Sequence, residues 1–478
     1  ECLQHAGTLG LDMDVVHTVA QCAEVGAADG PEEQFAGIPG SSADPAYVIY
    51  TSGTTGLPKG SVIRQRSVMR VVRHSSFYEA GPQDVFLLMS DYSFDGSVYD
   101  MFGALLNGST LVIVDKADVL ELDRLGAAIR DNGVTSFFIT AAMFNALIDS
   151  CPQVLGSVRC LLFGGEAASP VHVKRAFDIL GPGRIANGYG PTETTVFAAV
   201  HVVHDVVERD AIPIGRPIND TSLWVLDADR RLAPIGASGE LFIGGGGLAD
   251  GYLHLPELTD ERFVTSPDVP GERLYRTGDL VTVKSNGLVY YSGRLDQQVK
   301  FRGYRIETAE IVQVALDEPE VLWAHAAVHE QDGVKNLCLW VRFGEGGSDD
   351  TRLRSALRRK LPSYMIPSFI VPTDEVPLTR NGKLDAAALP SPTQVSIDAG
   401  TGSALEGAEA VVAQVWTKVL GVPVDSADAD FFTLGGDSIK AIQIVAGLKG
   451  HGLQVTVADM LECQTVGDLS ARAAALGR

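Results

Sequence analysis

The sequence predicts a multidomain protein in which a largely parallel α/β sheet is followed by an antiparallel or barrel-like section, a compact α+β unit and a helical domain. Three observations support this prediction. Short apolar runs alternate with helical periodicity in the first part of the chain, short strands and glycine-rich turns begin after about residue 212, and a linker of low hydrophobicity precedes the C-terminal segment. A chain of 478 residues is long enough for several such units.

Four apolar runs predict the strands of the parallel sheet, at residues 85–89, 110–114, 136–139 and 160–163. Leu122, Leu125 and Ile129 recur at helical spacing between them, and residues 141–148 predict a further helix. Buried apolar strands that alternate with helices are typical of a parallel sheet with helices on its faces. An earlier apolar run at residues 47–50, bounded by turn residues, predicts one more buried strand.

The later part of the chain divides by composition. Glycine-rich turns such as residues 239–247 predict the antiparallel or barrel-like section, and the compact α+β stretch that follows ends near Asp385. In the C-terminal segment, apolar positions at helical spacing around Trp416 and Ile442 predict two amphipathic helices. We therefore predict a large unit at residues 1–295, a small unit at 296–388, a linker at 389–407 and a helical domain at 408–478.

Composition limits the function classes. A net charge of −22 argues against a nucleic-acid partner, because phosphate backbones attract basic surfaces, but it leaves room for ATP at a local positive site. The six cysteines show neither CxxC spacing nor the density of a disulfide scaffold, which predicts reduced thiols. No apolar run has membrane-spanning length and the N-terminus lacks a targeting pattern, so we expect a cytoplasmic protein without a membrane partner.

A loop at residues 50–60 (Tyr-Thr-Ser-Gly-Thr-Thr-Gly-Leu-Pro-Lys-Gly) follows the first predicted strand. It can present backbone N–H groups, hydroxyls and one positive charge together, which is what a polyphosphate requires. The Walker-type pattern fails, because Pro58 precedes Lys59 and Gly60 follows it. The loop alone therefore leaves a phosphate cradle and a mobile Gly/Ser connection equally open.

Three further stretches combine residue types that suit a nucleotide. Residues 187–195 contain Tyr189, which could stack on a planar base, and Glu193, which could hold Mg²⁺ beside phosphates. Residues 275–280 and 293–294 add an acidic group suited to sugar hydroxyls and a basic group suited to phosphate, and a lysine at 383 follows an Asn-Gly turn. Each stretch taken alone is also compatible with an ordinary surface turn.

Residues 430–439 (Asp-Phe-Phe-Thr-Leu-Gly-Gly-Asp-Ser-Ile) precede the second helix of the C-terminal domain. Asp437 or Ser438 is suited to cap that helix, which is the structural interpretation. No histidine lies close in sequence to activate Ser438, and the sequence lacks a Gly-x-Ser-x-Gly elbow. A functional Ser438 would therefore be modified by another enzyme rather than act as a nucleophile itself.

Together these motifs resemble a nonribosomal peptide synthetase, namely an adenylation domain of the adenylate-forming superfamily followed by an all-α, four-helix peptidyl carrier domain. The resemblance runs from Ala46 to about Arg472 through nine motifs in the expected order: residues 50–60, 93–97, 188–193, 239–245, 275–279, 293–307, 361–367, 381–383 and 434–438. One such match is weak evidence, whereas nine in order are specific. The resemblance implies an amino-acid-adenylating ligase that uses ATP, Mg²⁺ and 4′-phosphopantetheine.

The resemblance also implies roles for individual residues. Tyr189 would stack on adenine, Asp279 would bind the ribose hydroxyls, and Glu193 would hold Mg²⁺. Lys383 would contact the substrate carboxylate and the attacked phosphate, with Glu193 and Thr51 as the other catalytic residues. Asp296 would be the hinge of the small unit. The complete ATP or AMP site would comprise Thr51, Ser52, Gly53, Thr54, Thr55, Gly56, Lys59, Asn187, Tyr189, Thr192, Asp279, Tyr291 and Arg294.

The same resemblance predicts a substrate pocket, closed by Lys383 and lined by Asp95, Gly96, Tyr99, Ile139, Leu162, Gly164, Gly188, Val196 and Phe197. Asp95 would pair with an α-ammonium group, and apart from Asp95 and Lys383 the only polar group is the Tyr99 hydroxyl. Because a buried charge without a partner is costly, we expect an aliphatic, valine-like amino acid. One methylene discriminates by only about 1–3 kcal/mol, so isoleucine and 2-aminobutyrate stay open.

The implied carrier domain requires partners. A phosphopantetheinyl transferase would modify Ser438, whose arm would take the amino acid as a thioester, and neighbouring synthetase domains for condensation or epimerisation would process it. A small MbtH-like activator protein is a further candidate partner.

Departures from the family pattern leave rival hypotheses open. Only 46 residues precede Tyr47, so we expect a truncated large unit, and Gln65, Asp250 and Thr308 differ from the usual residues. The chain could be a stand-alone acyl- or aryl-CoA ligase, or a non-catalytic carrier and docking scaffold. Asp95 and the domain around Ser438 argue against the ligase, because a ligase that releases CoA thioesters needs no tethered carrier.

Overall fold

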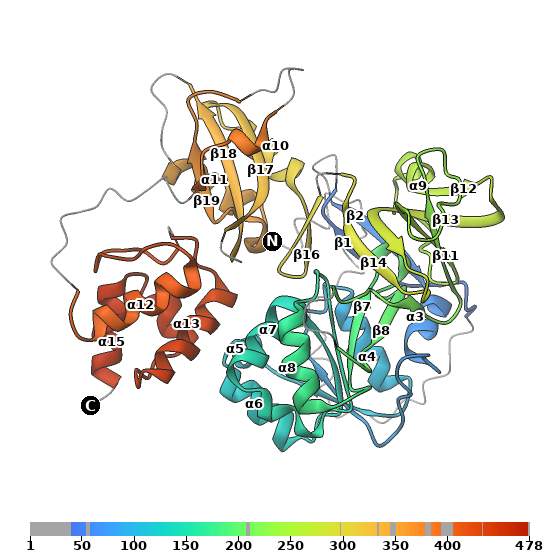
Figure 1. Ribbon diagram of the computed structural model, residues 1–478, viewed down its shortest axis with the longest axis horizontal. Coiled ribbons are helices and arrows are strands. Elements are labelled where there is room, and N and C mark those ends of the chain that lie inside the picture. Colours follow the sequence, from blue (N-terminus) through green and yellow to red (C-terminus); the bar gives the residue numbers. More distant parts are fainter. Residues whose placement is uncertain are drawn as a thin grey trace, which may run out of the picture. The chain divides into compact units, whose positions relative to one another are not determined.

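Figure 1 shows the computed structural model, which describes residues 40–53, 58–206, 211–296, 298–331, 334–344, 350–377, 384–392, 405–432 and 434–476. Four predicted site residues lie outside the described residues: Thr54, Thr55, Gly56 and Lys383. Within the described part of the chain, no helix combines the length and the apolar character that a membrane span needs.

Among the residues that the structure describes, the central sheet has seven strands in the order β4-β3-β5-β6-β7-β8-β9. Its parallel strands are β3 (Val85–Leu88), β4 (Thr110–Ile113), β5 (Ser136–Thr140), β6 (Cys160–Gly164) and β7 (Ile185–Tyr189). Its antiparallel edge consists of β8 (Ala199–Val202) and β9 (Arg216–Pro217). The four strands predicted from apolar runs and the largely parallel sheet are therefore confirmed.

Helices cover both faces of this sheet. One face carries α5 (Lys116–Leu120), α6 (Leu122–Asp131), α7 (Ala141–Ser150) and α8 (Pro170–Leu180), which are grouped beside the sheet in Figure 1. The other face carries α3 (Gln65–Val72) and α4 (Gly96–Leu105). Along β5, Phe137 and Ile139 pack with the first group of helices and Phe138 packs with the second. A strand buried on both faces is apolar throughout, which explains the continuous apolar runs.

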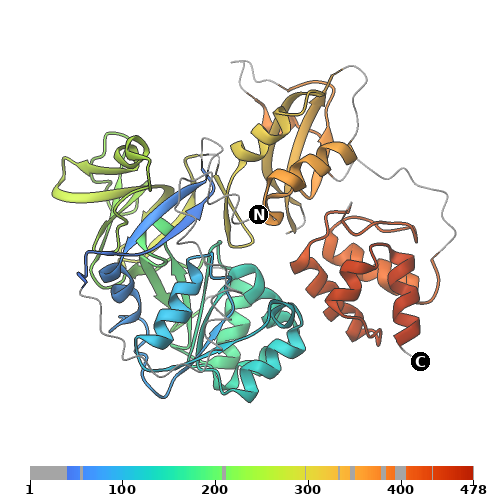
Figure 2. The same cartoon turned by 180° about the vertical axis from the view of Figure 1, so that it is seen from behind.

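The strand predicted at residues 47–50 forms, but the expectation that it is buried is wrong. Within the described residues, β1 (Pro45–Thr51) pairs with β2 (Lys59–Arg64) alone, in a two-stranded antiparallel sheet drawn in blue in Figure 2. Ile49 is 8% exposed, whereas Tyr50 is 41% exposed. Because successive side chains of a strand point to opposite faces, a ribbon covered on one face buries only alternate residues.

After β9 the chain forms a five-stranded antiparallel sheet, which confirms the predicted antiparallel section. The strands are β10 (Thr221–Leu226), β11 (Ser238–Gly245), β12 (Phe263–Ser266), β13 (Val269–Val283) and β14 (Val289–Arg294), with α9 (Pro256–Arg262) before β12.

The small unit is α+β, as predicted. It begins with the hairpin of β15 (Gln298–Phe301) and β16 (Tyr304–Glu307), and continues with α10 (Thr308–Leu316), β17 (Val321–Gln331), β18 (Val334–Phe343), α11 (Asp350–Lys360) and β19 (Phe369–Pro372). The last three strands form one sheet whose apolar side chains share a core with α10 and α11. In the hairpin, Lys300 lies opposite Arg305, so both side chains are on one face.

In the described part of the C-terminal domain there are four helices: α12 (Ala408–Leu420), α13 (Ser438–Gly450), α14 (Val457–Glu462) and α15 (Val466–Leu476). The apolar positions that predicted α12 and α13 form its core, since Trp416, Ile442 and Leu448 are buried. The all-α character is confirmed, while the boundaries at residues 295, 388 and 407 stay predictions.

Asp437 is the N-cap of α13. Its Oδ1 accepts hydrogen bonds from the backbone N–H groups of Ile439 at 2.9 Å and Lys440 at 3.1 Å. A side-chain oxygen in this position satisfies donors that the first turn of a helix leaves without partners. The capping role therefore belongs to Asp437, and Ser438 is the first residue of the helix.

Candidate active site

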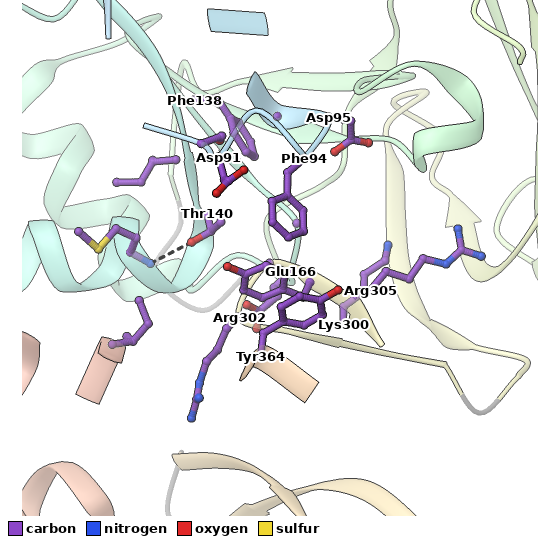
Figure 3. A pocket seen from close by; sticks show the side chains of 18 of the residues that line it. Asp91, Phe94, Asp95, Phe138, Thr140, Glu166, Lys300, Arg302, Arg305 and Tyr364 are labelled. Carbon is purple, nitrogen blue, oxygen red and sulfur yellow. Dashed lines mark hydrogen bonds between the residues drawn. The ribbon is translucent and has the colours of Figure 1, made fainter. Parts of the chain in front are cut away.

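A cavity of about 1830 Å³ opens at the carboxyl ends of the parallel strands. Thr140, at the end of β5, and Tyr189, at the end of β7, line it together with residues of the β15–β16 hairpin. Parallel sheets place ligand sites at this edge, because the loops that follow the strands can carry polar groups. Figure 3 shows Asp95 on one side of the open space and Lys300 and Arg305 on the other.

Glu193 is the centre of a buried charge cluster. It lies in the 3₁₀ turn η2 (Thr192–Thr194) and is fully buried. Its Oε1 accepts a hydrogen bond from the Tyr252 hydroxyl at 2.6 Å and lies 3.2 Å from Lys59 Nζ, while its Oε2 lies 3.0 Å from Arg305 Nη1. Burial alone would raise the pKa of Glu193, but Arg305 and Lys59 hold it well below its usual range. Burial lowers the pKa of Lys59 to about 8, against the attraction of Glu193.

Asp279 is the centre of a second cluster, on β13. Its carboxylate accepts a hydrogen bond from the Tyr189 hydroxyl at 2.5 Å and pairs with Arg294 Nη1 at 2.5 Å and Lys300 Nζ at 3.3 Å. Burial would raise the pKa of Asp279, but Lys300 and Arg294 lower it. Lys300 Nζ also lies 4.7 Å from the centre of the Tyr189 ring and 5.3 Å from that of Tyr291. Four residues predicted for the nucleotide site therefore lie together.

Sequence reasoning missed Lys300 and Arg305 as site residues. Both side chains project from the β15–β16 hairpin, where they are cross-strand neighbours, and both line the cavity. No hairpin was predicted at residues 298–307, because the turn at Arg302 and Gly303 that sets this register is not visible from composition.

Asp95 directly precedes α4 and is joined to η2. Its Oδ2 accepts a hydrogen bond from the Thr192 hydroxyl at 2.6 Å. Burial raises the pKa of Asp95, and the hydrogen bond from Thr192 opposes this shift. Thr192, predicted as a nucleotide contact, thus connects the expected ammonium site to Glu193, the next residue in the chain.

Six of the nine predicted pocket residues line the cavity: Asp95, Gly96, Ile139, Gly188, Val196 and Phe197. Tyr99, Leu162 and Gly164 are buried behind this lining, and the Tyr99 hydroxyl pairs with Ser136 Oγ at 2.9 Å. Phe138, which sequence reasoning missed, belongs to the lining instead, with its ring 5.5 Å from that of Phe197.

The described residues at the start of the loop predicted to bind phosphates reach the same cavity. Thr51 and Ser52 line it, and the Ser52 hydroxyl donates a hydrogen bond to the carbonyl oxygen of Arg305 at 2.9 Å. Asn187 also lines it, with its amide donating to the Pro213 carbonyl at 2.9 Å. The predicted hinge residue Asp296 accepts hydrogen bonds from Arg294 Nε at 2.6 Å and Nη2 at 2.8 Å. Gly53 is buried beside Ser52.

The start of α13 also borders the cavity. Gly436 and Asp437 are among its lining residues, and the Asp437 carboxylate pairs with Arg302 in the turn of the hairpin. Lys440 Nζ donates a hydrogen bond to Asn336 Oδ1 at 2.7 Å. Ser438, the residue predicted to carry phosphopantetheine, therefore directly follows Asp437, which lines the cavity.

Glu193 is the predicted ligand of Mg²⁺. Mg²⁺ is commonly held by one or two carboxylates together with substrate phosphates. Among the described residues, no group of three His, Cys, Asp or Glu side chains could hold a metal ion. Glu193 has suitable oxygens, but Tyr252 and Lys59 engage one and Arg305 engages the other. Both Glu193 oxygens are therefore already paired with cations, and a magnesium ion at Glu193 would compete with Arg305 and Lys59.

Three family models match this chain. That of the AMP-binding enzymes covers residues 6–253, that of the AMP-binding enzyme C-terminal domain covers residues 311–383, and that of the phosphopantetheine attachment site covers residues 410–473. The first match covers more than half of the chain. The chain therefore belongs to the AMP-binding enzymes.

Individual relatives of the chain show which type of AMP-binding enzyme it resembles. Tyrocidine synthase 3 from Brevibacillus parabrevis is 40% identical over 443 residues, which cover 91% of this chain and 7% of that protein. Bacitracin synthase 1 from Bacillus licheniformis is 39% identical over 452 residues, 93% of this chain and 8% of that protein. The solved structure of holo-PA1221, an NRPS protein containing adenylation and PCP domains bound to a vinylsulfonamide inhibitor, is 34% identical with a TM-score of 0.77, and the match covers 93% of this chain and 76% of that chain.

This chain is an adenylation and carrier region of the nonribosomal peptide synthetase type, with an ATP-using, adenylate-forming part and a carrier part that has a 4′-phosphopantetheine attachment site. The family, the fold class, ATP and phosphopantetheine predicted from the sequence are confirmed. The carrier match argues against the stand-alone CoA ligase. The chain spans less than a tenth of the length of the two synthetases.

Proposed function

We propose that this chain activates an aliphatic α-amino acid, valine or a close relative, as an aminoacyl-AMP and transfers it to the phosphopantetheine arm carried by Ser438. The observation that supports this proposal is the position of Asp95. Its carboxylate lies in the cavity wall beside an apolar surface of Gly96, Phe138, Val196 and Phe197. One carboxylate beside an apolar surface suits a ligand with one ammonium group and an aliphatic side chain.

In the first step, an oxygen of the substrate carboxylate attacks the α-phosphorus of ATP, a P–O bond forms, and the bond to pyrophosphate breaks. Negative charge develops on the phosphates, and fixed cations in a water-poor site oppose it. We assign this role to Arg305 and Lys300, which line the cavity, and to Lys383. Tyr189 and Asp279 would hold the base and the ribose of the nucleotide.

In the second step, the acyl group leaves AMP for the carrier. When attached, the phosphopantetheine arm supplies the thiol that receives the acyl group. The pairing of Asp437 with Arg302 supports a route from the carrier into the cavity, because it holds the start of α13 at the cavity wall. Asp296, paired with Arg294, remains our candidate for the hinge of the small unit.

The partners of the whole protein belong to this proposal as well. They are a phosphopantetheinyl transferase, neighbouring condensation or epimerisation domains, and a small MbtH-like activator protein. The match of the carrier segment to the phosphopantetheine attachment site supports the transferase, and the length of the relatives supports neighbouring domains. We further propose that the protein acts in the cytoplasm, where ATP and amino acids are available.

Amino-acid-dependent exchange between ATP and labelled pyrophosphate tests the first step. We expect exchange with valine, isoleucine and 2-aminobutyrate, and none with charged amino acids. Exchange with aryl or fatty acids would favour a CoA ligase, and no exchange from a folded chain would favour a non-catalytic scaffold.

Intact mass after incubation with CoA and a phosphopantetheinyl transferase tests the carrier. The unmodified chain should gain the mass of one phosphopantetheine group, whereas Ser438→Ala should gain none. A gain by Ser438→Ala would refute the assignment of that residue.

A further inference from the structure

Arg70 is a buried arginine that contacts the segment after η2. It lies in the last turn of α3 and is 7% exposed. Its Nη2 donates hydrogen bonds to the carbonyl oxygens of Thr194 at 2.8 Å and Phe197 at 2.9 Å, and lies 3.4 Å from that of Thr195. Its Nη1 donates to the Thr221 hydroxyl. One guanidinium group therefore gathers three carbonyl oxygens of a four-residue turn.

The turn that Arg70 contacts has a backbone conformation that its residues disfavour. Thr195 and Val196 have positive φ values of 62° and 60°. They are the one adjacent pair of non-glycine residues with positive φ in the described part of the chain. Both are β-branched, and the left-handed region brings their side chains close to the backbone, so neighbouring contacts must hold the turn in place.

Gly247 supports the turn from a second direction and packs against the arginine. The Thr195 hydroxyl donates a hydrogen bond to the Gly247 carbonyl at 2.7 Å. A Cβ atom at Gly247 would lie 2.3 Å from Arg70 Nη2 and 2.4 Å from its Cζ, so a side chain there would displace the guanidinium group. Ser67, one turn earlier on α3, donates to the Gly246 carbonyl at 2.7 Å and fixes the helix to the same loop.

The charge of Arg70 strengthens its hold on the turn. Burial lowers the pKa of Arg70 to about 10, and the charge of Asp220 opposes this shift, so the guanidinium group stays protonated near neutral pH. Hydrogen bonds from an ionised donor are roughly twice as strong as those from a neutral one, and the planar fork aligns several of them at once. Lysine at this position could keep the charge but not the fork.

The turn joins two parts of the active site. Glu193 immediately precedes it, and Val196 and Phe197 line the cavity. The Phe197 ring lies 5.5 Å from that of Phe138 and 5.9 Å from that of Tyr99, so a shift of the turn changes the shape of the pocket wall.

We propose that Arg70 is a positioning residue for amino-acid selectivity, because it holds the turn that places Val196 and Phe197 in the pocket wall. The inference rests on the proposed function. It adds a residue, Arg70, that does not line the cavity but holds the residues that do.

Two variants test this role. Arg70→Lys removes the guanidinium fork, and Gly247→Ala displaces it while the arginine stays. In the pyrophosphate-exchange assay, we expect the KM for the preferred amino acid to rise about 10- to 100-fold in both variants, which corresponds to the loss of one or two charge-assisted hydrogen bonds. The KM for ATP should stay close to that of the unmodified chain, and the preference for valine over alanine and leucine should fall. Arg66→Lys, an exposed change on the same helix, is the matched control and should leave all three quantities unchanged.

The outcomes distinguish a failure of the proposed role of Arg70 from a failure of the proposed substrate. Equal rises in both KM values, or an unchanged preference among amino acids, would overturn it. If the unmodified chain activates a different amino acid, the same comparison with that amino acid tests Arg70. If it activates none, amide hydrogen exchange at residues 194–198 decides: faster exchange in Arg70→Lys and Gly247→Ala but not in Arg66→Lys supports the role, and equal exchange overturns it. Should Arg70→Lys fail to fold, Gly247→Ala serves for the same measurements.

Discussion

Asp95→Asn should make the chain much less able to distinguish an amino acid from the same acid without its amine. The change removes the charge of Asp95 but keeps its size and a side-chain oxygen for Thr192, which donates to Asp95 at 2.6 Å. Truncating one partner of a buried, hydrogen-bonded charge pair costs about 2–5 kcal/mol. Because Asp95 is half-buried, solvent screens the pair and we take the lower part of that range, about 2–3 kcal/mol. The corresponding fall in kcat/KM for valine is about 30- to 150-fold.

Pyrophosphate exchange with valine and with 3-methylbutanoate measures this effect. The second compound lacks the ammonium group, so its kcat/KM should change little, and the ratio of the two values should collapse in Asp95→Asn. Asp91→Asn, a change at an exposed carboxylate on the same cavity rim, is the matched control and should retain the ratio of the unmodified chain. An unchanged ratio in Asp95→Asn would refute the ammonium site.

The pH dependence of the same site has a definite sign. Burial raises the pKa of Asp95, with Thr192 opposing the shift. As the pH falls through this raised pKa, the carboxyl group takes up a proton and loses the charge that pairs with the substrate. The KM for valine should therefore begin to rise at a higher pH than the titration of an ordinary aspartate would give, while the KM for 3-methylbutanoate should show no such rise.

The remaining predictions concern the cations of the site. Lys383→Ala should abolish adenylate formation while ATP binding, measured by calorimetry, is largely retained; unchanged exchange would contradict its catalytic role. Arg305→Ala frees an oxygen of the buried Glu193 for a metal ion. Mn²⁺, a paramagnetic substitute for Mg²⁺, should therefore bind the variant more tightly than the unmodified protein, and water-proton relaxation measures this affinity. Arg302→Ala, in the same hairpin but paired with Asp437, should leave the Mn²⁺ affinity unchanged, and equal affinity in Arg305→Ala would show that the arginine does not compete with the metal.

The strands could be predicted from the sequence where both faces of the strand are buried. β3, β5 and β6 pack between helices on both faces, so their apolar runs are continuous and their positions follow from the sequence. β1 has a similar run, but among the described strands its one partner is β2, and Tyr50 is exposed. A run of apolar residues predicts that a strand forms. It does not predict how many other strands pair with it or whether both of its faces are covered.

The site was predictable where chemistry lies in short motifs and unpredictable where it depends on distant contacts. Tyr189, Asp279 and Arg294 were each chosen from local residue types, and the fold brings them within hydrogen-bonding distance. Arg70 contacts carbonyl oxygens more than 120 residues later in the chain, and Arg305 reaches a carboxylate 112 residues earlier. Such pairings follow from tertiary packing, and no spacing or composition within either segment indicates them.

The net charge of the chain is a poor guide to what the cavity binds, because charges at the surface are screened over about 8–10 Å. The ligand that the cavity binds depends on where the negative and positive side chains lie inside the site. Thr192 holds Asp95 on one side, and the next residue, Glu193, is paired with Lys59 and Arg305 on the other. In the function proposed above, a single 3₁₀ turn therefore connects the proposed ammonium site at Asp95 to Arg305, the one of these two cations that lines the cavity. An α-amino acid reacting with ATP needs this separation of charge, since its ammonium and the triphosphate must be bound at once without neutralising each other.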